Sequence, residues 1–276
     1  MTDAAGRFAA LGRAEEGAVR LAEAALWIAA TEYADLDVRA WLGRLDALGE
    51  AAARSIAPGT GADEAAAAIG GLLFEREGFR GNAEAYYDPR NSFLNDVLDR
   101  RLGIPITLSV VYLDVAAAAG VTARGVGLPG HFVVSVERGG TARLVDPFHG
   151  GALLDEDDCL ALVRRVLGQP VPFDPAWLRP VTTVEIVARM LTNLKAVFAG
   201  ASDWPRALRT AECLVALRPE ALGELRDRGA VHAKLGDPRG AIRDWERYLT
   251  GAPQAGDAAE VRRQLRAMRQ SLAVLN

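Results

Sequence analysis

The C-terminal third of the chain repeats a pattern with a fixed period, and this repeat constrains the fold more than any other feature. An aspartate, an alanine and a proline recur 34 residues apart: Asp203, Ala207 and Pro219, then Asp237, Ala241 and Pro253. A period of this length is typical of stacked helical hairpins, in which each pair of helices buries its apolar face against the next pair. Two such repeats are too few to stand alone, so we expect them to dock against the rest of the chain.

Length and composition bound the remaining possibilities. The chain has 276 residues, half of them hydrophobic, which is enough for two domains. We place the first at residues 1–180 and the second at residues 181–276. The net charge is −4 and no block of Lys or Arg occurs, which argues against nucleic-acid or membrane-surface partners. The N-terminus lacks the apolar core of a secretion signal, so a cytoplasmic location is expected.

Cysteine usage argues against a disulfide framework. The chain has two cysteines, Cys159 and Cys213, far apart and without a CxxC spacing. Both are interpreted as buried thiols, and no metal or cofactor is expected.

Helical periodicity dominates the first hundred residues. "DPRNSFLNDVLDRRLG" predicts a helix over 92–102 that ends before Gly103. The next run, "PITLSVVYLDVAAAAG", is rich in β-branched residues but is too long for an ordinary strand. Its length therefore favours a helix with Pro105 in the first turn and Gly120 at the C-terminal end.

After Gly120 the period changes, because "TARGVGL", "HFVVSVER" and "ARLVDPF" are short β-like runs separated by turn residues. The second and third runs predict a hairpin, since Gly139 and Gly140 tolerate positive φ. The predicted fold class is α+β, with a mostly helical N-terminal part, a small antiparallel sheet and C-terminal helical repeats.

Two resemblances follow from these residues. The C-terminal pattern resembles the tetratricopeptide repeat, a class that usually binds other proteins. The helix beginning at "GIP", the strand "GHFVV" and the strand "LVDPF" resemble the papain-like transglutaminase core, whose triad takes Cys from a helix start, His from a strand and Asp from the next strand. His131 and Asp146 match the base and acid positions, whereas Pro105 stands where the nucleophilic Cys belongs.

Two hydroxyls near the helix start offer an alternative nucleophile. Ser109 shares a helix face with Pro105 one turn deeper, and Thr107 points elsewhere. We expect both hydroxyls to donate to the helix carbonyl four residues before them instead.

The whole arrangement is similar to the SirB1 family, a transglutaminase-like domain followed by tetratricopeptide repeats. The resemblance rests on "EYADLDVRAWLGRLDALG", "YYDPRNSFLNDVLDRRLGIPITLSVVYL", "GVGLPGHFVV" and "VDPFHGG". Pro105 belongs to that family's pattern.

Polar residues around the relic triad predict a cleft. Its candidate lining is Tyr86, Tyr87, Asn91, Asn95, Ser109, His131, Asp146 and His149, and the alternative is that these side chains only hold loops in place. "PRNSFLND" would set Asn91 and Asn95 one turn apart on one helix face.

Three functions follow from these patterns. The favoured one is a non-catalytic regulatory protein that binds a partner protein through the repeats. The second is a hydrolase or acyltransferase that uses His131 and Asp146 with water or Ser109. The third is ligand binding by the relic cleft.

Overall fold

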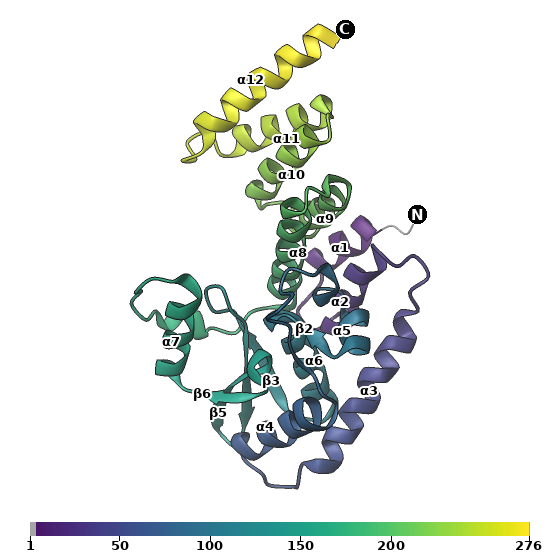
Figure 1. Cartoon of the computed structure of the whole chain (residues 1–276), viewed down its shortest axis with the longest axis vertical. Helices are drawn as coiled ribbons and strands as arrows, with labels where there is room; N and C mark the ends of the chain where they lie inside the picture. Colours follow the sequence, from purple (N-terminus) through teal and green to yellow (C-terminus); the bar gives the residue numbers. More distant parts are fainter. Residues whose placement is uncertain (1–3, 276) are drawn as a thin grey trace. The chain divides into compact units, whose positions relative to one another are not determined.

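The computed structural model describes the backbone of residues 4–275 and the side chains of residues 4–273. The chain forms two compact units (Figure 1). One unit comprises residues 15–190. The other combines the N-terminal segment up to Ala14 with the chain from Leu191 onward. Helices predominate and one small antiparallel sheet is present, which confirms the predicted α+β class. Within the described residues, no helix is long and apolar enough to cross a membrane.

The larger unit contains a helical N-terminal half. Its helical elements in chain order are α2 (Leu21–Ala30), α3 (Val38–Ser55), α4 (Ala62–Gly70), the π-helical turn η1 (Gly71–Arg76), the 3₁₀ turn η2 (Pro89–Asn91), α5 (Leu94–Arg100) and α6 (Pro105–Ala118). Asp37 caps the N-terminus of α3 by accepting hydrogen bonds from two backbone N–H groups of its first turn. Two short strands, β1 (Arg80–Gly81) and β2 (Leu102–Gly103), pair in parallel, and β2 lies directly before α6.

Helix α6 is the central element of this unit, and its prediction as a helix is confirmed. Every residue from Pro105 to Ala116 is buried, so the uniform apolar character reflects burial on all sides. Pro105 occupies the first helical turn, where its missing N–H removes no helix hydrogen bond. A Cβ on Gly49 of α3 would lie 2.2 Å from the Ala118 Cβ, which shows how closely these two helices approach.

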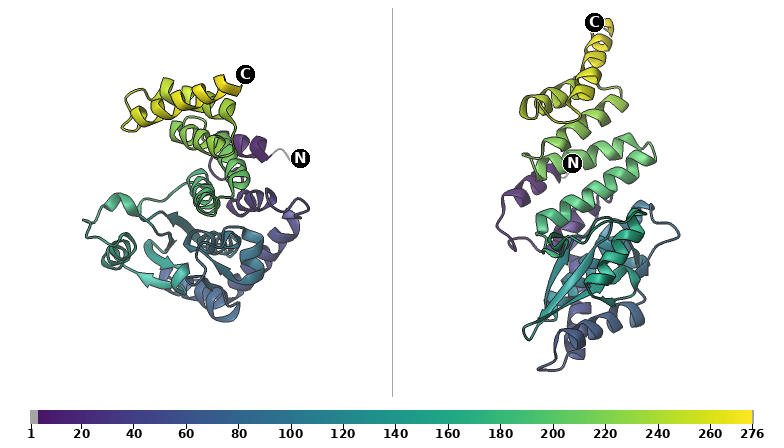
Figure 2. Two further views of the ribbon diagram at one scale, coloured as in Figure 1. Left: turned by 45° about the horizontal axis from the view of Figure 1, so that its top comes forward. Right: turned by 90° about the vertical axis from the view of Figure 1, so that its left-hand side faces the viewer.

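The sheet follows α6 and has the strand order β3-β4-β5-β6. Its strands are drawn as teal arrows in Figure 2. Its strands are β3 (Thr122–Val126), β4 (Val133–Arg138), β5 (Thr141–Asp146) and β6 (Ala152–Leu154), all antiparallel to their neighbours. The predicted hairpin is confirmed, with Gly139 and Gly140 at φ of 60° and 79° in the turn between β4 and β5. Positive φ at both central residues matches the right-handed twist of the flanking strands.

Both faces of β4 are covered. Val133 belongs to a core cluster with Cys159 and Leu162 of α7 (Glu156–Leu167). Val134 and Val136, which point to the opposite face, are fully buried as well. The segment after α7 contains a 3₁₀ turn, η4 (Pro175–Leu178), and leads into α8 (Thr183–Gly200).

The predicted helix over 92–102 was too long at both ends. The structure has α5 only from Leu94 to Arg100, and Arg101 adopts the left-handed conformation with φ of 59°. Its guanidinium hydrogen-bonds the Leu98 carbonyl and the Glu77 carboxylate. Residues 102–103 then pair as a strand with residues 80–81, so Gly103 is a strand residue and not the helix terminator.

The repeat unit is built from helical hairpins. Its helices are α1 (Ala4–Arg13), the C-terminal part of α8, α9 (Trp204–Leu217), α10 (Leu222–Lys234), α11 (Pro238–Gly251) and α12 (Ala258–Leu275). The recurring aspartates Asp203 and Asp237 cap α9 and α11, each accepting a hydrogen bond from the backbone N–H three residues later. Ala207 and Ala241 are fully buried. The 34-residue pattern therefore marks equivalent structural positions in consecutive hairpins.

The N-terminal helix α1 belongs to the repeat unit although it lies far from it in sequence. It packs on α9, and a Cβ added to Gly12 would lie 2.1 Å from the Leu217 carbonyl oxygen. Phe8 and Leu11 of α1 are buried. A helix from the start of the chain thus covers apolar surface of the first hairpin.

Candidate functional site

His131 and Asp146 lie side by side in the larger unit. His131 Nε2 is 2.9 Å from Asp146 Oδ2, and both side chains are almost completely buried. The run "HFVVSVER" predicts a strand that begins at His131, but β4 begins two residues later, at Val133. His131 instead ends a turn in which its backbone N–H donates to the Leu128 carbonyl. Asp146 is the last residue of β5, so the hairpin brings the two side chains together.

Asp146 also caps the 3₁₀ turn η3 (Pro147–His149). Its Oδ1 accepts the backbone N–H groups of Phe148 and His149 at 3.0 and 3.3 Å. Burial by itself raises the pKa of Asp146, but hydrogen bonds and charge from His131 and His149 outweigh burial and lower its pKa below the usual value. The carboxylate is therefore held in its ionised form near neutral pH.

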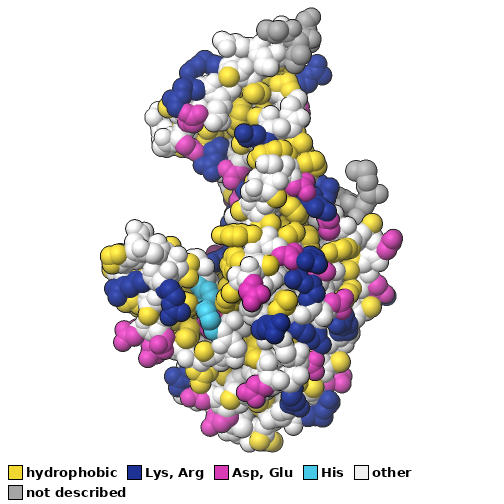
Figure 3. All heavy atoms as spheres, in the orientation of Figure 1, with side chains coloured by type: hydrophobic (Ala, Val, Ile, Leu, Met, Phe, Trp, Pro, Cys, Tyr) yellow, Lys and Arg dark blue, Asp and Glu magenta, His cyan; other side chains and the backbone are white. Residues whose placement is uncertain are grey.

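His149 completes a group of three. Its Nδ1 lies 2.7 Å from Asp146 Oδ2, the same oxygen that contacts His131. The two imidazole rings stack with centroids 5.6 Å apart. The His149 side chain is 46% exposed, so the group opens to solvent on this side. Histidine side chains reach the surface on the face shown in Figure 3.

Arg189 of α8 supports the turn that carries His131, and sequence reasoning missed it. Its guanidinium donates to the backbone carbonyls of Leu128 at 2.9 Å and His131 at 2.7 Å. It also lies over the Phe132 ring, 5.5 Å from the centroid. Burial lowers the pKa of Arg189. Arg189 is 58 residues from His131 in sequence, and no local motif marks it, so only the folded chain reveals this contact.

The start of α6 carries no nucleophile that contacts the imidazole. Pro105 is buried in the first helical turn. The hydroxyl of Thr107 contacts two backbone carbonyls: its Oγ1 lies 2.7 Å from the Asn91 carbonyl oxygen and 3.1 Å from the Ile104 carbonyl oxygen. Ser109 Oγ is buried and has no hydrogen-bond partner among the described residues. The prediction that both hydroxyls bond the carbonyl four residues before them was therefore wrong, because Thr107 turns back to cap its own helix.

Asn91 braces a loop. It is fully buried, its Nδ2 donates to the carbonyls of Ala85 and Tyr86, and its Oδ1 accepts from Asn82. These contacts favour the alternative in which this side chain holds the loop in place.

The expected alignment of Asn91 with Asn95 on one helix face was also wrong, since Asn91 ends η2 and Asn95 lies in α5. Asn95 Oδ1 is buried without a partner in the described part of the chain. Tyr87 is 77% exposed.

The two thiols do not belong to this site. Cys159 is buried in the core between the sheet and α7, and burial raises its pKa to about 11. Cys213 lies in α9 of the repeat unit, where burial raises its pKa to about 12. A protonated, buried thiol is a poor nucleophile.

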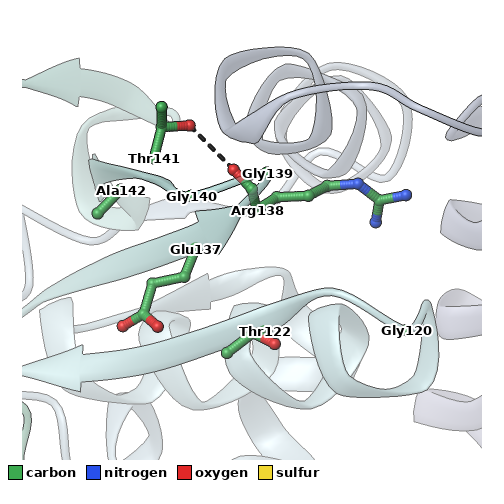
Figure 4. A pocket seen from close by; sticks show the side chains of 8 residues that line it. All are labelled: Gly120, Thr122, Glu137, Arg138, Gly139, Gly140, Thr141 and Ala142. Atoms are coloured by element: carbon green, nitrogen blue, oxygen red, sulfur yellow. Dashed lines mark hydrogen bonds between the residues drawn. The ribbon is translucent and has the colours of Figure 1, made fainter.

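A pocket of about 540 Å³ lies elsewhere on the larger unit, around the turn between β4 and β5 (Figure 4). Its lining includes Gly120, Thr122 and the turn residues 137–142, and Thr141 Oγ1 donates to the Arg138 carbonyl there. None of the site residues predicted from the sequence lines it.

Comparison with known proteins defines the class. Residues 39–192 match the model of the transglutaminase-like superfamily, and residues 194–266 match a tetratricopeptide-repeat model. These spans follow the two features deduced from the sequence, the helix-and-hairpin core and the 34-residue repeat.

Similar proteins agree over most of the chain. A UPF0162 protein of Xylella fastidiosa is 37% identical over 258 residues, which is 92% of each chain. A UPF0162 protein of Pseudomonas aeruginosa is 30% identical over 231 residues, 83% of each chain. F-box only protein 21 of Mus musculus is 33% identical over 135 residues, 46% of this chain and 21% of the mouse protein. The chain therefore belongs to the transglutaminase-like superfamily and, within it, to the proteins named UPF0162.

Proposed function

We propose that this protein is a non-catalytic binding protein of the cytoplasm, with a regulatory role. In this proposal the transglutaminase-like unit is a pseudoenzyme of the SirB1 type, and the tetratricopeptide repeats bind a partner protein. The observation that carries the proposal is Pro105 at the start of α6, where the superfamily pattern calls for a nucleophile.

The neighbouring groups support the same conclusion. Acyl transfer by a triad needs a nucleophile within hydrogen-bond reach of the base. The hydrogen bonds of Thr107 run to backbone carbonyls, and Ser109 lies one turn inside a helix that is buried on all sides. His131 is instead engaged with Asp146. The pair thus keeps base and acid without the group that would attack a substrate.

The repeats support the binding part of the proposal. Tetratricopeptide repeats generally mediate protein interactions, and stacked helical hairpins present extended surfaces for this purpose. The hairpin α10–α11 has a well-packed interior, with Leu225, Trp245 and Tyr248 in one buried cluster. On α10, Ala230 and Lys234 are exposed one turn apart and offer a place to test contact with a partner.

Site-specific photocrosslinking in the full chain tests this proposal. A photoreactive amino acid replaces Ala230 on α10 in one variant and Leu153 on β6 in a matched control, since Leu153 is an exposed position of the other unit. We expect a discrete crosslinked protein at position 230 in cells, with much less at position 153. Equal labelling at both positions, or none at position 230, contradicts binding through this face of the repeats.

A further inference from the structure

Three donor atoms from different side chains converge at the site. One ligand atom from each of His131, Asp146 and His149 lies within 4.8 Å of the others. Both imidazoles contact the same carboxylate oxygen, Asp146 Oδ2, at 2.9 and 2.7 Å. The third histidine of the chain, His232, lies in the repeat unit.

The carboxylate is oriented by the backbone. Asp146 Oδ1 accepts the N–H groups of Phe148 and His149, which leaves Oδ2 directed at the two rings. On the other side, Arg189 fixes the carbonyl of His131 and so the turn that presents its ring. Such supporting contacts hold the side chains that coordinate a metal ion in position before the ion binds.

The donor chemistry suits a borderline transition ion. Two imidazole nitrogens and one carboxylate oxygen are ligands of Zn²⁺, Fe²⁺ and Co²⁺, whereas Ca²⁺ requires six or more oxygens. Tetrahedral Zn²⁺ places its donor atoms about 3.4 Å apart, given metal–ligand distances of about 2.0–2.2 Å. To reach this spacing, the pairs at 2.9 and 2.7 Å need to open by about 0.5 and 0.7 Å, and the two imidazole nitrogens, which lie within 4.8 Å of each other, form the third pair.

The exposure of the three side chains leaves a path for the ion. His131 and Asp146 have 4% and 2% of their side chains exposed, and His149 has 46%. An ion can enter past His149, and its remaining coordination position then faces solvent. A water molecule or an oxygen donor from a ligand would occupy that position.

We infer that His131, Asp146 and His149 form a binding site for a single divalent transition-metal ion of the Zn²⁺ type. This inference revises the sequence-based expectation of no metal. It does not depend on the proposed role of the repeats. In this inference the three side chains bind a metal ion, whereas the triad of the superfamily would need a nucleophile.

Titration of the tag-free full chain with Co²⁺ tests the inference, because Co²⁺ reports its coordination by visible absorption. We expect one Co²⁺ per chain with the intense bands of a four- or five-coordinate site, displaced by Zn²⁺. The substitution His149→Ala removes one ligand from a half-exposed position and is expected to weaken binding at least about tenfold. The matched control His232→Ala removes the histidine outside the site and should bind like the wild type.

Two results overturn the inference. One is the absence of stoichiometric Co²⁺ binding by the wild-type chain, which would make the group a hydrogen-bonded network only. The other is a wrong dependence on the histidines: Co²⁺ binding that persists in both the His149→Ala and the His131→Ala variants, or that is lost in the His232→Ala variant. Circular dichroism of each variant distinguishes a loss of Co²⁺ binding from a loss of the fold.

Discussion

Gly229 of α10 offers the sharpest quantitative test of the repeat packing. A Cβ at this position would lie 2.6 Å from Cδ1 and Nε1 of Trp245 on α11. This is about 1 Å shorter than a normal contact between carbon atoms. Relieving such an overlap costs about 1–3 kcal/mol. Displacing the indole also endangers its hydrogen bond from Nε1 to the Arg226 carbonyl, 3.1 Å long, which contributes about 1 kcal/mol.

The helix propensity of alanine opposes these costs. Replacing Gly by Ala in a helix interior gains about 1 kcal/mol, so the free energy of unfolding of Gly229→Ala should fall by about 1–3 kcal/mol. Gly223 in the first turn of the same helix has no atom within 4 Å of an added Cβ. Gly223→Ala should therefore be neutral or stabilising by up to about 1 kcal/mol. Urea denaturation followed by circular dichroism measures both variants, and equal behaviour of the two would refute the packing argument.

Two further predictions concern thiols and acid stability. Cys159 and Cys213 are buried with raised pKa values, so a thiol reagent at mildly alkaline pH should label neither in the folded chain and both in urea; rapid labelling of the folded chain would contradict their burial. Burial raises the pKa of Asp227, but contacts with Lys195 and Arg226 outweigh it and lower the pKa. Its contribution to stability is thus present above the unfolded value of about 3.9 and is lost as the pH falls through the lower folded value. Asp227→Asn should therefore be less stable than the wild type near neutral pH, with a deficit that shrinks below about pH 4; a deficit independent of pH in urea melts would contradict this assignment.

The sequence was sufficient to predict those elements whose structure is decided by nearby residues. The recurrence of Asp203 as Asp237 predicted repeated helical hairpins, and the two aspartates cap α9 and α11 in the same way. The run from Pro105 to Gly120 was assigned to a helix by its length, and the paired glycines at 139 and 140 predicted the hairpin turn.

Other features depended on contacts between distant segments. The joining of α1 to the repeat unit rests on its packing against α9, which no local pattern encodes. The early end of α5 comes from the left-handed conformation of Arg101, a residue type that rarely adopts it. The support that Arg189 gives to the His131 turn is likewise a contact across the fold. Among the site residues, Asn91 follows the predicted alternative of holding a loop in place, but its partners in that loop could not be identified from the sequence.

The proposal of a non-catalytic protein requires that no side chain near His131 acts as a nucleophile. Intact-protein mass spectrometry after exposure to an activated acyl ester tests this requirement. The wild-type chain should form no acyl adduct that depends on His131. Pro105→Cys, which restores a thiol at the helix start, should be acylated in a reaction that His131→Ala slows. An adduct on Ser109 or Thr107 of the wild type, lost in His131→Ala, would contradict the claim.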